Sequence, residues 1–370
     1  MEWIYQQPDW PRFRWDDVTT LLASLRFRQG RLLGRMRSLG FELRSEARLD
    51  TLTTDVVTSS AIEGELLSPE EVRSSIARRL GLDAGGLVAS GRDVDGIVEM
   101  MIDATRNYAA PLTAERLCSW HAALFPTARS GMQRITVGAW RTDHSGPMEV
   151  LSGPMGREKV HFRAPAAQQV PREMDRFLEW YNGASDIDPV LRAALAHFWF
   201  VTVHPFDDGN GRIARAITDM SLARADDSAD RYYSTSSQIE AEQSAYYDHL
   251  ERRQRGTLDV TEWISWFLGC LERSLETAEA KLSTVISRAQ FWEMVGRHSI
   301  NERQRAVLHR MLGDFKGHLN SSRYAKLAGC STDTALRDIR ELLDLGIVVR
   351  NPGGGRSTSY RLVRLEREGY

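Results

Sequence analysis

Apolar residues recur at helical spacing along most of the chain, and breaks in this pattern divide it into three blocks. In the first block, residues 1–84, leucines near helical spacing predict a long helix over 18–46 and a second helix over 49–63. Gly64 is typical of the position just after a helix. Ser68 followed by Pro69 and two glutamates predicts the start of a third helix. We therefore expect an N-terminal helical domain.

The second block, residues 92–297, is also mostly helical. Its periodicity predicts helices over 94–109, 113–124, 166–182, 189–203, 212–225, 240–254 and 260–290. The pattern changes to alternation over 137–165, where glycines and prolines interrupt it. Two short strands, 148–152 and 159–163, are expected there, and the Gly153-Pro154-Met155-Gly156 turn between them predicts a β-hairpin.

The third block, residues 300–370, has a different order of elements. Helices are expected over 302–313, 321–327 and 332–345, followed by strands over 347–350 and 358–362 with a glycine-rich turn between them. A helix, a helix-turn-helix and a β-hairpin in this order are typical of a winged helix. The predicted fold class is mainly α: a helical bundle with a β-hairpin, preceded by an N-terminal helical domain and followed by a winged helix-turn-helix.

Charge is balanced overall but uneven along the chain. The 370 residues hold 48 Lys plus Arg and 50 Asp plus Glu, so no overall basic field attracts nucleic acid or an anionic membrane. Residues 300–370 nevertheless carry thirteen basic and eight acidic side chains, a local charge of +5. Arg337, Arg340 and Arg356 are therefore candidate DNA contacts. Acidic residues on the same helix leave docking to a protein as the alternative.

Cysteine usage and hydropathy predict the compartment. The three cysteines lie far apart, which argues against a disulfide framework and a thiolate zinc site. The first ten residues have no signal-peptide pattern, and no apolar run is long enough to span a bilayer. We expect a cytoplasmic protein that does not enter membranes.

The segment His204-Pro205-Phe206-Asp207-Asp208-Gly209-Asn210-Gly211-Arg212-Ile213-Ala214-Arg215 carries the strongest chemical signal. Its glycines let the backbone turn tightly, and the helix that follows opens with free N–H groups that form an anion site. Arg212 and Arg215 lie three residues apart on one helical face, which suits a polyphosphate. Asp208 is placed to hold an accompanying Mg²⁺, and a neutral His204 imidazole can take a proton from a nucleophile.

This segment resembles the signature of the Fic family, H-x-F-x-[DE]-G-N-G-R-x-x-R, at every fixed position. The resemblance implies a helical core that transfers AMP from ATP to a Ser, Thr or Tyr hydroxyl of a protein, with ATP and Mg²⁺ as cofactors. It implies that His204 is the general base and Asp208 the Mg²⁺ ligand. It assigns the phosphates to Gly209, Asn210, Gly211, Arg212 and Arg215. No Walker A sequence is present, so a P-loop kinase does not compete.

Two further parts of the site follow from the resemblance. In Fic enzymes a β-hairpin flap holds the target segment by strand addition, for which a hairpin edge offers unpaired N–H and C=O groups. The flap residues would be Val150, Lys159, Val160, His161 and Phe162. Adenine needs an aromatic pocket, and the segment 232–247 offers Tyr246 and Tyr247, with core packing of these tyrosines as the alternative.

The segment Ser59-Ser60-Ala61-Ile62-Glu63-Gly64 resembles a second family motif, [ST]-x-x-x-E-[GN], which marks an inhibitory helix. Ser59 and Glu63 are four residues apart and share a helical face. A carboxylate at a helix C-terminus is disfavoured by the helix dipole unless a cation faces it. The resemblance implies that Arg215 is this cation and that the ion pair takes the place of the γ-phosphate. Ser59, Glu63 and Gly64 are therefore the expected inhibitory residues.

The sequence thus predicts an autoinhibited protein adenylyltransferase that acts on ATP and a protein target, the enzyme itself included. Rivals within enzymes are removal of AMP, with Glu63 orienting a water, and transfer of a different phosphate-containing group. A rival from another class is a winged-helix transcription regulator that only senses nucleotide. The complete motif from His204 to Arg215 favours an enzyme. The oligomeric state, a homodimer among the options, stays open.

Overall fold

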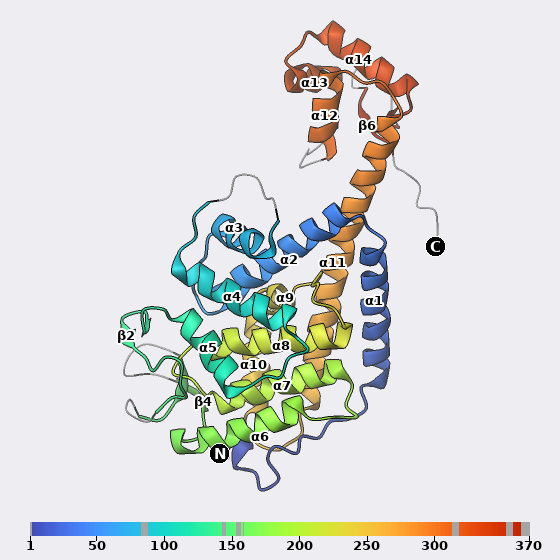
Figure 1. Cartoon of the computed structure of the whole chain (residues 1–370). Helices are drawn as coiled ribbons and strands as arrows, with labels where there is room; N and C mark the ends of the chain where they lie inside the picture. Colours follow the sequence, from blue (N-terminus) through green and yellow to red (C-terminus); the bar gives the residue numbers. More distant parts are fainter. Residues whose placement is uncertain are drawn as a thin grey trace. The chain divides into compact units, whose positions relative to one another are not determined.

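The computed structural model describes residues 2–82, 88–142, 146–152, 157, 159–312, 318–352 and 358–363. The chain divides into two compact units, residues 1–278 and 279–370, which are described separately (Figure 1). Helices dominate both units, and the described strands form three two-stranded antiparallel sheets. The mainly α class predicted from the sequence is confirmed.

The N-terminal part contains a helix break that the hydrophobic pattern does not reveal. After the short turn η1 (Ile4–Gln6), α1 (Thr19–Arg37) ends and α2 (Phe41–Ile62) begins, so the single helix predicted over 18–46 is wrong. The Ser38 hydroxyl donates to the Arg35 carbonyl at 2.7 Å, and Gly40 takes an extended conformation before α2. Apolar spacing continues across this break, because both helices bury one face.

The start of the third helix follows its local sequence. α3 (Pro69–Leu80) begins as predicted: the Ser68 side chain accepts from the backbone N–H of Glu71, and Pro69 occupies the first helical position. Gly81 ends this helix in the left-handed region, where glycine is unstrained. The N-terminal helices lie in the same compact unit as the bundle that follows.

The central bundle surrounds α7 (Pro189–Val203), whose residues from Val190 to Val203 are nearly all buried. A helix that is apolar on all sides belongs in a core. It packs against α8 (Asn210–Asp226), which follows it in the chain (Figure 1). The other elements of the bundle are α4 (Arg92–Arg106), α5 (Ala114–Leu124), η3 (Ala167–Gln169), α6 (Val170–Asn182), α9 (Thr235–Ala241), α10 (Gln243–Arg253) and the long α11 (Thr261–Gly296). The helix predicted over 240–254 is thus two helices that meet at Glu242.

Two hairpins accompany the bundle. β1 (Arg129–Ser130) pairs with β2 (Gln133–Arg134), and β3 (Glu149–Ser152) pairs with β4 (Lys159–Arg163). The register of the second hairpin shifts between Val150 and Leu151, which marks a β-bulge. The tip predicted at residues 153–156 lies outside the described residues.

The second unit contains α12 (Glu302–Leu312), α13 (Ser321–Ala328), α14 (Thr332–Asp344) and the hairpin of β5 (Val348–Arg350) with β6 (Tyr360–Leu362). This is the predicted order of elements. Asn320 and Ser331 cap α13 and α14 with their side chains. Its core holds Val307, Leu308, Tyr324, Ile339 and Leu342, together with residues from the end of α11. Across the described part of the chain, no helix is long and apolar enough to cross a membrane.

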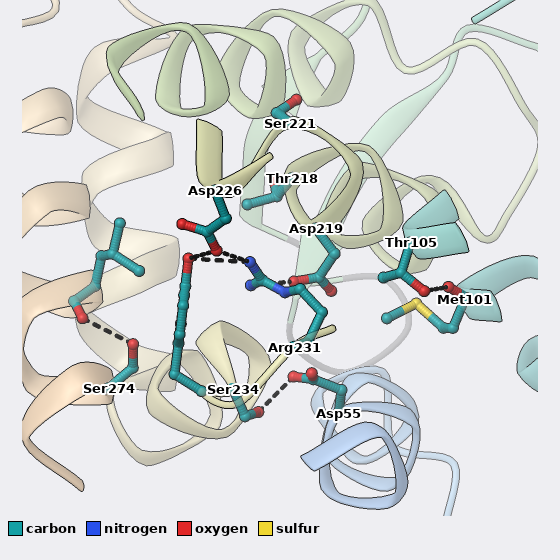
Figure 2. Close-up of polar contacts among 12 residues, drawn as sticks. Asp55, Met101, Thr105, Thr218, Asp219, Ser221, Asp226, Arg231, Ser234 and Ser274 are labelled. Carbon is teal, nitrogen blue, oxygen red and sulfur yellow. Dashed lines mark hydrogen bonds and ion pairs between the residues drawn. The ribbon is translucent and has the colours of Figure 1, made fainter. Parts of the chain in front are cut away.

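Buried polar contacts join α8 to the segment that follows it, and α2 to the start of α9 (Figure 2). The Arg231 guanidinium lies 3.0 Å from Asp219 and 3.3 Å from Asp226. Asp55 of α2 accepts a hydrogen bond from the Ser234 hydroxyl. Burial, and next the negative charge of Asp219, raise the pKa of Asp55 well above its usual range. This contact with Ser234 holds α2 near its middle.

Candidate active site

The loop between α7 and α8 is built largely by hydrogen bonds of its own side chains. The Asn210 side chain accepts from the Phe206 backbone N–H at 3.0 Å and donates to the Phe206 carbonyl at 2.8 Å. Gly209 precedes α8 with φ of 76°, a left-handed conformation that favours glycine. Asn210 stays a predicted phosphate-binding residue, and its buried side chain closes the loop that presents the N-terminus of α8.

A carboxylate of α2 lies over this N-terminus. A Cβ atom on Gly211 would come within 2.0 Å of Glu63 Oε1, so only glycine leaves room for the carboxylate there. The first N–H groups of a helix favour anions, and phosphates are frequent occupants of such positions. Glu63 therefore occupies an anion site that the motif provides.

Arg215 holds the end of α2 with three hydrogen bonds. Its Nε donates to Ser59 Oγ at 2.8 Å, and its Nη2 donates to the Ser59 carbonyl at 2.7 Å and to Glu63 Oε1 at 2.8 Å. The arginine side chain is 1% exposed and that of Glu63 is 28% exposed. The ion pair expected from the family motif is present, and Arg215 also faces the carbonyl end of α2, which the helix dipole favours.

Arg212 makes a second ion pair, which the sequence analysis missed. Its Nη1 donates to Glu65 Oε2 at 2.6 Å, and its guanidinium lies 5.0 Å from the centroid of the Phe125 ring. Glu65 is two residues beyond Glu63, so the segment after α2 places one carboxylate on each arginine of the motif. The sequence offered a signal, because Glu63 and Glu65 are two acidic residues matched to two arginines.

His204 ends α7 in a left-handed conformation, with φ of 52° and ψ of 59°. Its Nδ1 lies 3.2 Å from the Val201 carbonyl, a contact that favours a proton on Nδ1 and leaves Nε2 as the acceptor. Burial, above all other causes, lowers the pKa of His204 to about 4. The imidazole is therefore neutral at pH 7 and can accept a proton.

Asp208 has a carboxylate already engaged within the loop. One oxygen accepts from the Gly209 N–H at 2.5 Å and the other contacts the Ser130 hydroxyl. Among the described residues, no group of three or more His, Cys, Asp or Glu side chains is arranged to hold a metal ion. Mg²⁺ commonly binds through one or two carboxylates together with substrate phosphates, so a single Asp208 suits an ion that arrives with a nucleotide.

The two candidate adenine tyrosines differ in exposure. Tyr246 is 2% exposed, and its hydroxyl lies 2.9 Å from His197 Nε2 within an aromatic cluster that includes Trp263 and Trp266. It therefore packs in the core, which was the alternative. Tyr247, the next residue on α10, is 41% exposed, and its hydroxyl lies 3.5 Å from the Ile62 carbonyl of α2.

The flap residues divide into exposed and anchored side chains. His161 Nδ1 lies 2.5 Å from Glu251 of α10, and Lys159 pairs with the same carboxylate at 3.1 Å. Phe162 is buried, with its ring edge-on to Trp3 and Tyr5. Val150 is half-buried, whereas Val160 and its cross-strand partner Leu151 are both exposed. Leu151 was not among the flap residues predicted from the sequence.

In the second unit, Arg337 and Arg340 of α14 are exposed, and Arg356 lies outside the described residues. Asp338 of the same helix is buried and accepts hydrogen bonds from Arg303 and from the Tyr324 hydroxyl. This acidic residue therefore contributes less to the exposed face of α14 than its place in the sequence suggested.

Comparisons with known proteins agree with this geometry. The Fic/DOC family model matches residues 111–222, and a domain of unknown function, DUF4172, matches residues 3–82. Two curated relatives named "Protein adenylyltransferase Fic" are similar to the chain. The protein from Drosophila willistoni is 25% identical over 62% of this chain and 42% of its own length. The one from Culex quinquefasciatus is 27% identical over 66% and 45%. The chain thus spans less than half the length of these relatives.

Solved structures show the same fold at lower identity. A Fic family protein from Desulfovibrio desulfuricans has a TM-score of 0.53 and 21% identity, covering 94% of this chain and 97% of that chain. A Fic domain containing signaling protein from Bacteroides thetaiotaomicron has a TM-score of 0.52 and 21% identity, covering 71% and 97%. The fold and site define a mainly α protein whose helix N-terminus, two arginines and neutral histidine suit a nucleotide phosphate chain. Residues 111–222 of the chain match the Fic/DOC family.

Proposed function

We propose that this protein is an autoinhibited protein adenylyltransferase that transfers AMP from ATP to a Ser, Thr or Tyr hydroxyl of a target protein. The observation that carries the proposal is the Glu63 carboxylate, which lies over Gly211 and bonds to Arg215. An anion from the chain itself holds a site suited to phosphate, close to a histidine in its neutral form. The names of the curated relatives support AMP transfer as the reaction.

The reaction needs a base, an acceptor and a bound triphosphate. The target hydroxyl oxygen forms a bond to the α-phosphorus, and the bond from that phosphorus to the oxygen that bridges to the β-phosphate breaks. Pyrophosphate leaves, and the hydroxyl proton passes to Nε2 of His204. General-base assistance of this kind contributes about 10²- to 10⁴-fold to rate. The N–H groups at the start of α8, with Arg212 and Arg215, bind the phosphate oxygens.

Asp208 would hold the magnesium ion that accompanies the nucleotide. Mg²⁺ neutralises phosphate charge and orients the leaving group when bound. Asp208 accepts a hydrogen bond from the Gly209 N–H, and this bond keeps the Asp208 carboxylate at the edge of the loop.

Inhibition would come from two carboxylates rather than one. Glu63 forms an ion pair with Arg215, and Glu65 forms one with Arg212, so both guanidinium groups are engaged before nucleotide binds. A triphosphate must displace these pairs or bind in a shifted position. The proposal therefore predicts slow transfer by the wild-type protein.

The target would dock on the flap through its exposed apolar pair. Leu151 and Val160 face each other across β3 and β4 and are 49% and 36% exposed. An extended peptide with an apolar side chain suits this surface, because added strands gain backbone hydrogen bonds and side-chain contacts together.

The test of the function is incorporation of labelled AMP. The Glu63→Gly protein is incubated with ATP labelled at the α-phosphate, Mg²⁺ and a protein extract, and modified residues are identified by mass spectrometry. We expect AMP on hydroxyl side chains, and no incorporation with Glu63→Gly plus His204→Ala, which should still bind ATP. Label on neither the protein nor the extract would refute the proposal. AMP removal from a modified protein by the wild type would favour the hydrolytic rival.

A second proposal concerns the C-terminal unit. The exposed Arg337 and Arg340 and the inward-facing Asp338 support binding of DNA phosphates by α14. We expect the full chain to bind duplex DNA at low salt, with weaker binding after both arginines are changed to alanine. Binding that is absent at low salt, or unaffected by the change, would favour protein docking instead.

A further inference from the structure

The segment 136–141 runs beside the loop that carries His204. The Thr136 N–H donates to Asp207 Oδ2 at 2.8 Å, and the Arg141 N–H donates to the Pro205 carbonyl at 2.9 Å. The rings of Trp140 and Phe206 are 5.0 Å apart. A short stretch of chain, outside the signature motif, thus supports the loop along its length.

The backbone of His204 needs such support. Its φ of 52° lies in the left-handed region, where residues with a Cβ atom are strained. Such a conformation persists when surrounding contacts hold it in place. The chain must turn there, because the next residue is Pro205, which cannot continue α7.

The Arg141 side chain supplies two of these contacts. Its guanidinium donates through Nε to the His204 carbonyl at 2.7 Å and through Nη2 to the Pro165 carbonyl at 2.5 Å. Pro165 lies two residues beyond the end of β4, at the base of the flap. The arginine is 3% exposed, so neither hydrogen bond competes with bulk water.

We propose that Arg141 is a positioning residue, which fixes the peptide that carries the His204 imidazole and ties it to the base of the flap. Arg141 would then fix the position of the imidazole relative to a hydroxyl bound at the flap. This inference rests on the proposed AMP transfer, for which His204 is the base. A planar guanidinium can reach two carbonyls at once in a fixed geometry, whereas a lysine ammonium lacks that geometry.

The charge of Arg141 has a separate effect. Burial is the largest cause of the low pKa of His204, and the positive charge of Arg141 lowers that pKa further. The Val201 carbonyl and the carboxylates of Glu63 and Asp208 act in the opposite direction. Position and charge can therefore be separated by two substitutions at the same site.

The experiment compares Arg141→Gln and Arg141→Lys in the Glu63→Gly background. Misplacement of a catalytic group by about 1 Å can cost about 100-fold in rate. We expect both variants to lower kcat by about 10- to 100-fold with little change in the KM for ATP. In Arg141→Gln, the acid limb of the kcat–pH profile should move to higher pH, because the positive charge is lost. In Arg141→Lys, the limb should stay near its original position.

Arg116 offers a matched control. It is another largely buried arginine that holds backbone carbonyls, those of Asp103, Asn107, Ala110 and Pro111, far along the chain from His204. Arg116→Gln should lower the Tm but leave the kcat–pH profile unchanged. A loss of ATP affinity equal to the loss of kcat in the Arg141 variants would overturn the proposal. An unchanged kcat would do so too.

Two measures keep the test decisive. If Arg141→Gln does not fold, Arg141→Lys alone decides the kcat–KM split. If the Glu63→Gly protein transfers no AMP, the proposed function fails, and the effect of Arg141 on His204 is then tested by NMR. The His204 imidazole, assigned by comparison with His204→Ala, should titrate at higher pH in Arg141→Gln than in the parent. An identical titration would overturn the effect of Arg141 on His204.

Discussion

Replacement of Glu63 by glycine isolates the contact on which the autoinhibition proposal depends. Glu63 is the C-cap of α2, with φ of −90° and ψ of 8°, a conformation that glycine adopts without strain. The change removes the carboxylate over Gly211 and frees Arg215 for a phosphate. It leaves the helix itself intact, because the residue follows the last helical position.

The size of the effect can be worked out from the contacts of Arg215. Only one of the three hydrogen bonds described above goes to Glu63, and the two bonds to Ser59 persist. Hydrogen bonds to charged groups contribute about 1.5–3 kcal/mol. Since Glu63 is partly exposed, solvent screening argues against a larger value. At about 1.36 kcal/mol for each factor of ten, release of this bond should raise the transfer rate about 10- to 150-fold.

The assay is the initial rate of AMP incorporation with saturating ATP and Mg²⁺. Two further variants test the interpretation of the Glu63→Gly rate. Glu63→Gln keeps the size of the side chain but loses its charge, so it should fall between wild type and Glu63→Gly. Arg215→Ala in the Glu63→Gly background should cancel the gain, because the phosphate then lacks its guanidinium. A Glu63→Gly rate within twofold of wild type would refute the inhibitory role of this residue.

Two further predictions test the contacts around α2. Glu65→Gln frees Arg212, so it should raise the rate of AMP transfer several-fold alone and further in the Glu63→Gly background. A transfer rate equal to that of the parent in both backgrounds would show that the second ion pair does not inhibit. Burial and the charge of Asp219 raise the pKa of Asp55 in the folded state, so the native protein binds this proton more tightly than the unfolded chain does. The free energy of unfolding should therefore fall as pH rises from about 4 toward the raised pKa. Asp55→Asn should remove this fall and keep or increase stability at pH 7, whereas Asp219→Asn should destabilise the fold because it breaks an ion pair with the buried Arg231. Denaturant titrations at several pH values measure both effects. Equal losses of unfolding free energy in the two variants would contradict the raised pKa of Asp55.

Short-range sequence signals, such as helix caps and the alternation of apolar residues, predicted much of the fold. The boundaries of α7 and β4 follow from the sequence, because Pro189 and Asp188 define a helix start and alternation defines a strand. Capping by Ser68 did the same for the start of α3. The break at residues 38–40 was hidden, because apolar periodicity reports which face is buried and not whether the helix is continuous.

Part of the candidate site was likewise predicted from the sequence, and part was not. The anion-binding helix start, its two arginines and the histidine before them are legible in the sequence, because these groups lie within twelve consecutive residues whose spacing fixes their geometry. The neutral form of the histidine comes from its burial in the folded protein. The sequence also pointed to Glu63 through a second short motif. Tertiary structure alone decided that Glu65 reaches Arg212, 147 positions away, and that Arg141 holds the His204 carbonyl from 63 positions away. Such pairs leave no periodic trace in the sequence, because packing of separate helices and loops, and not the local backbone, sets the distance between them.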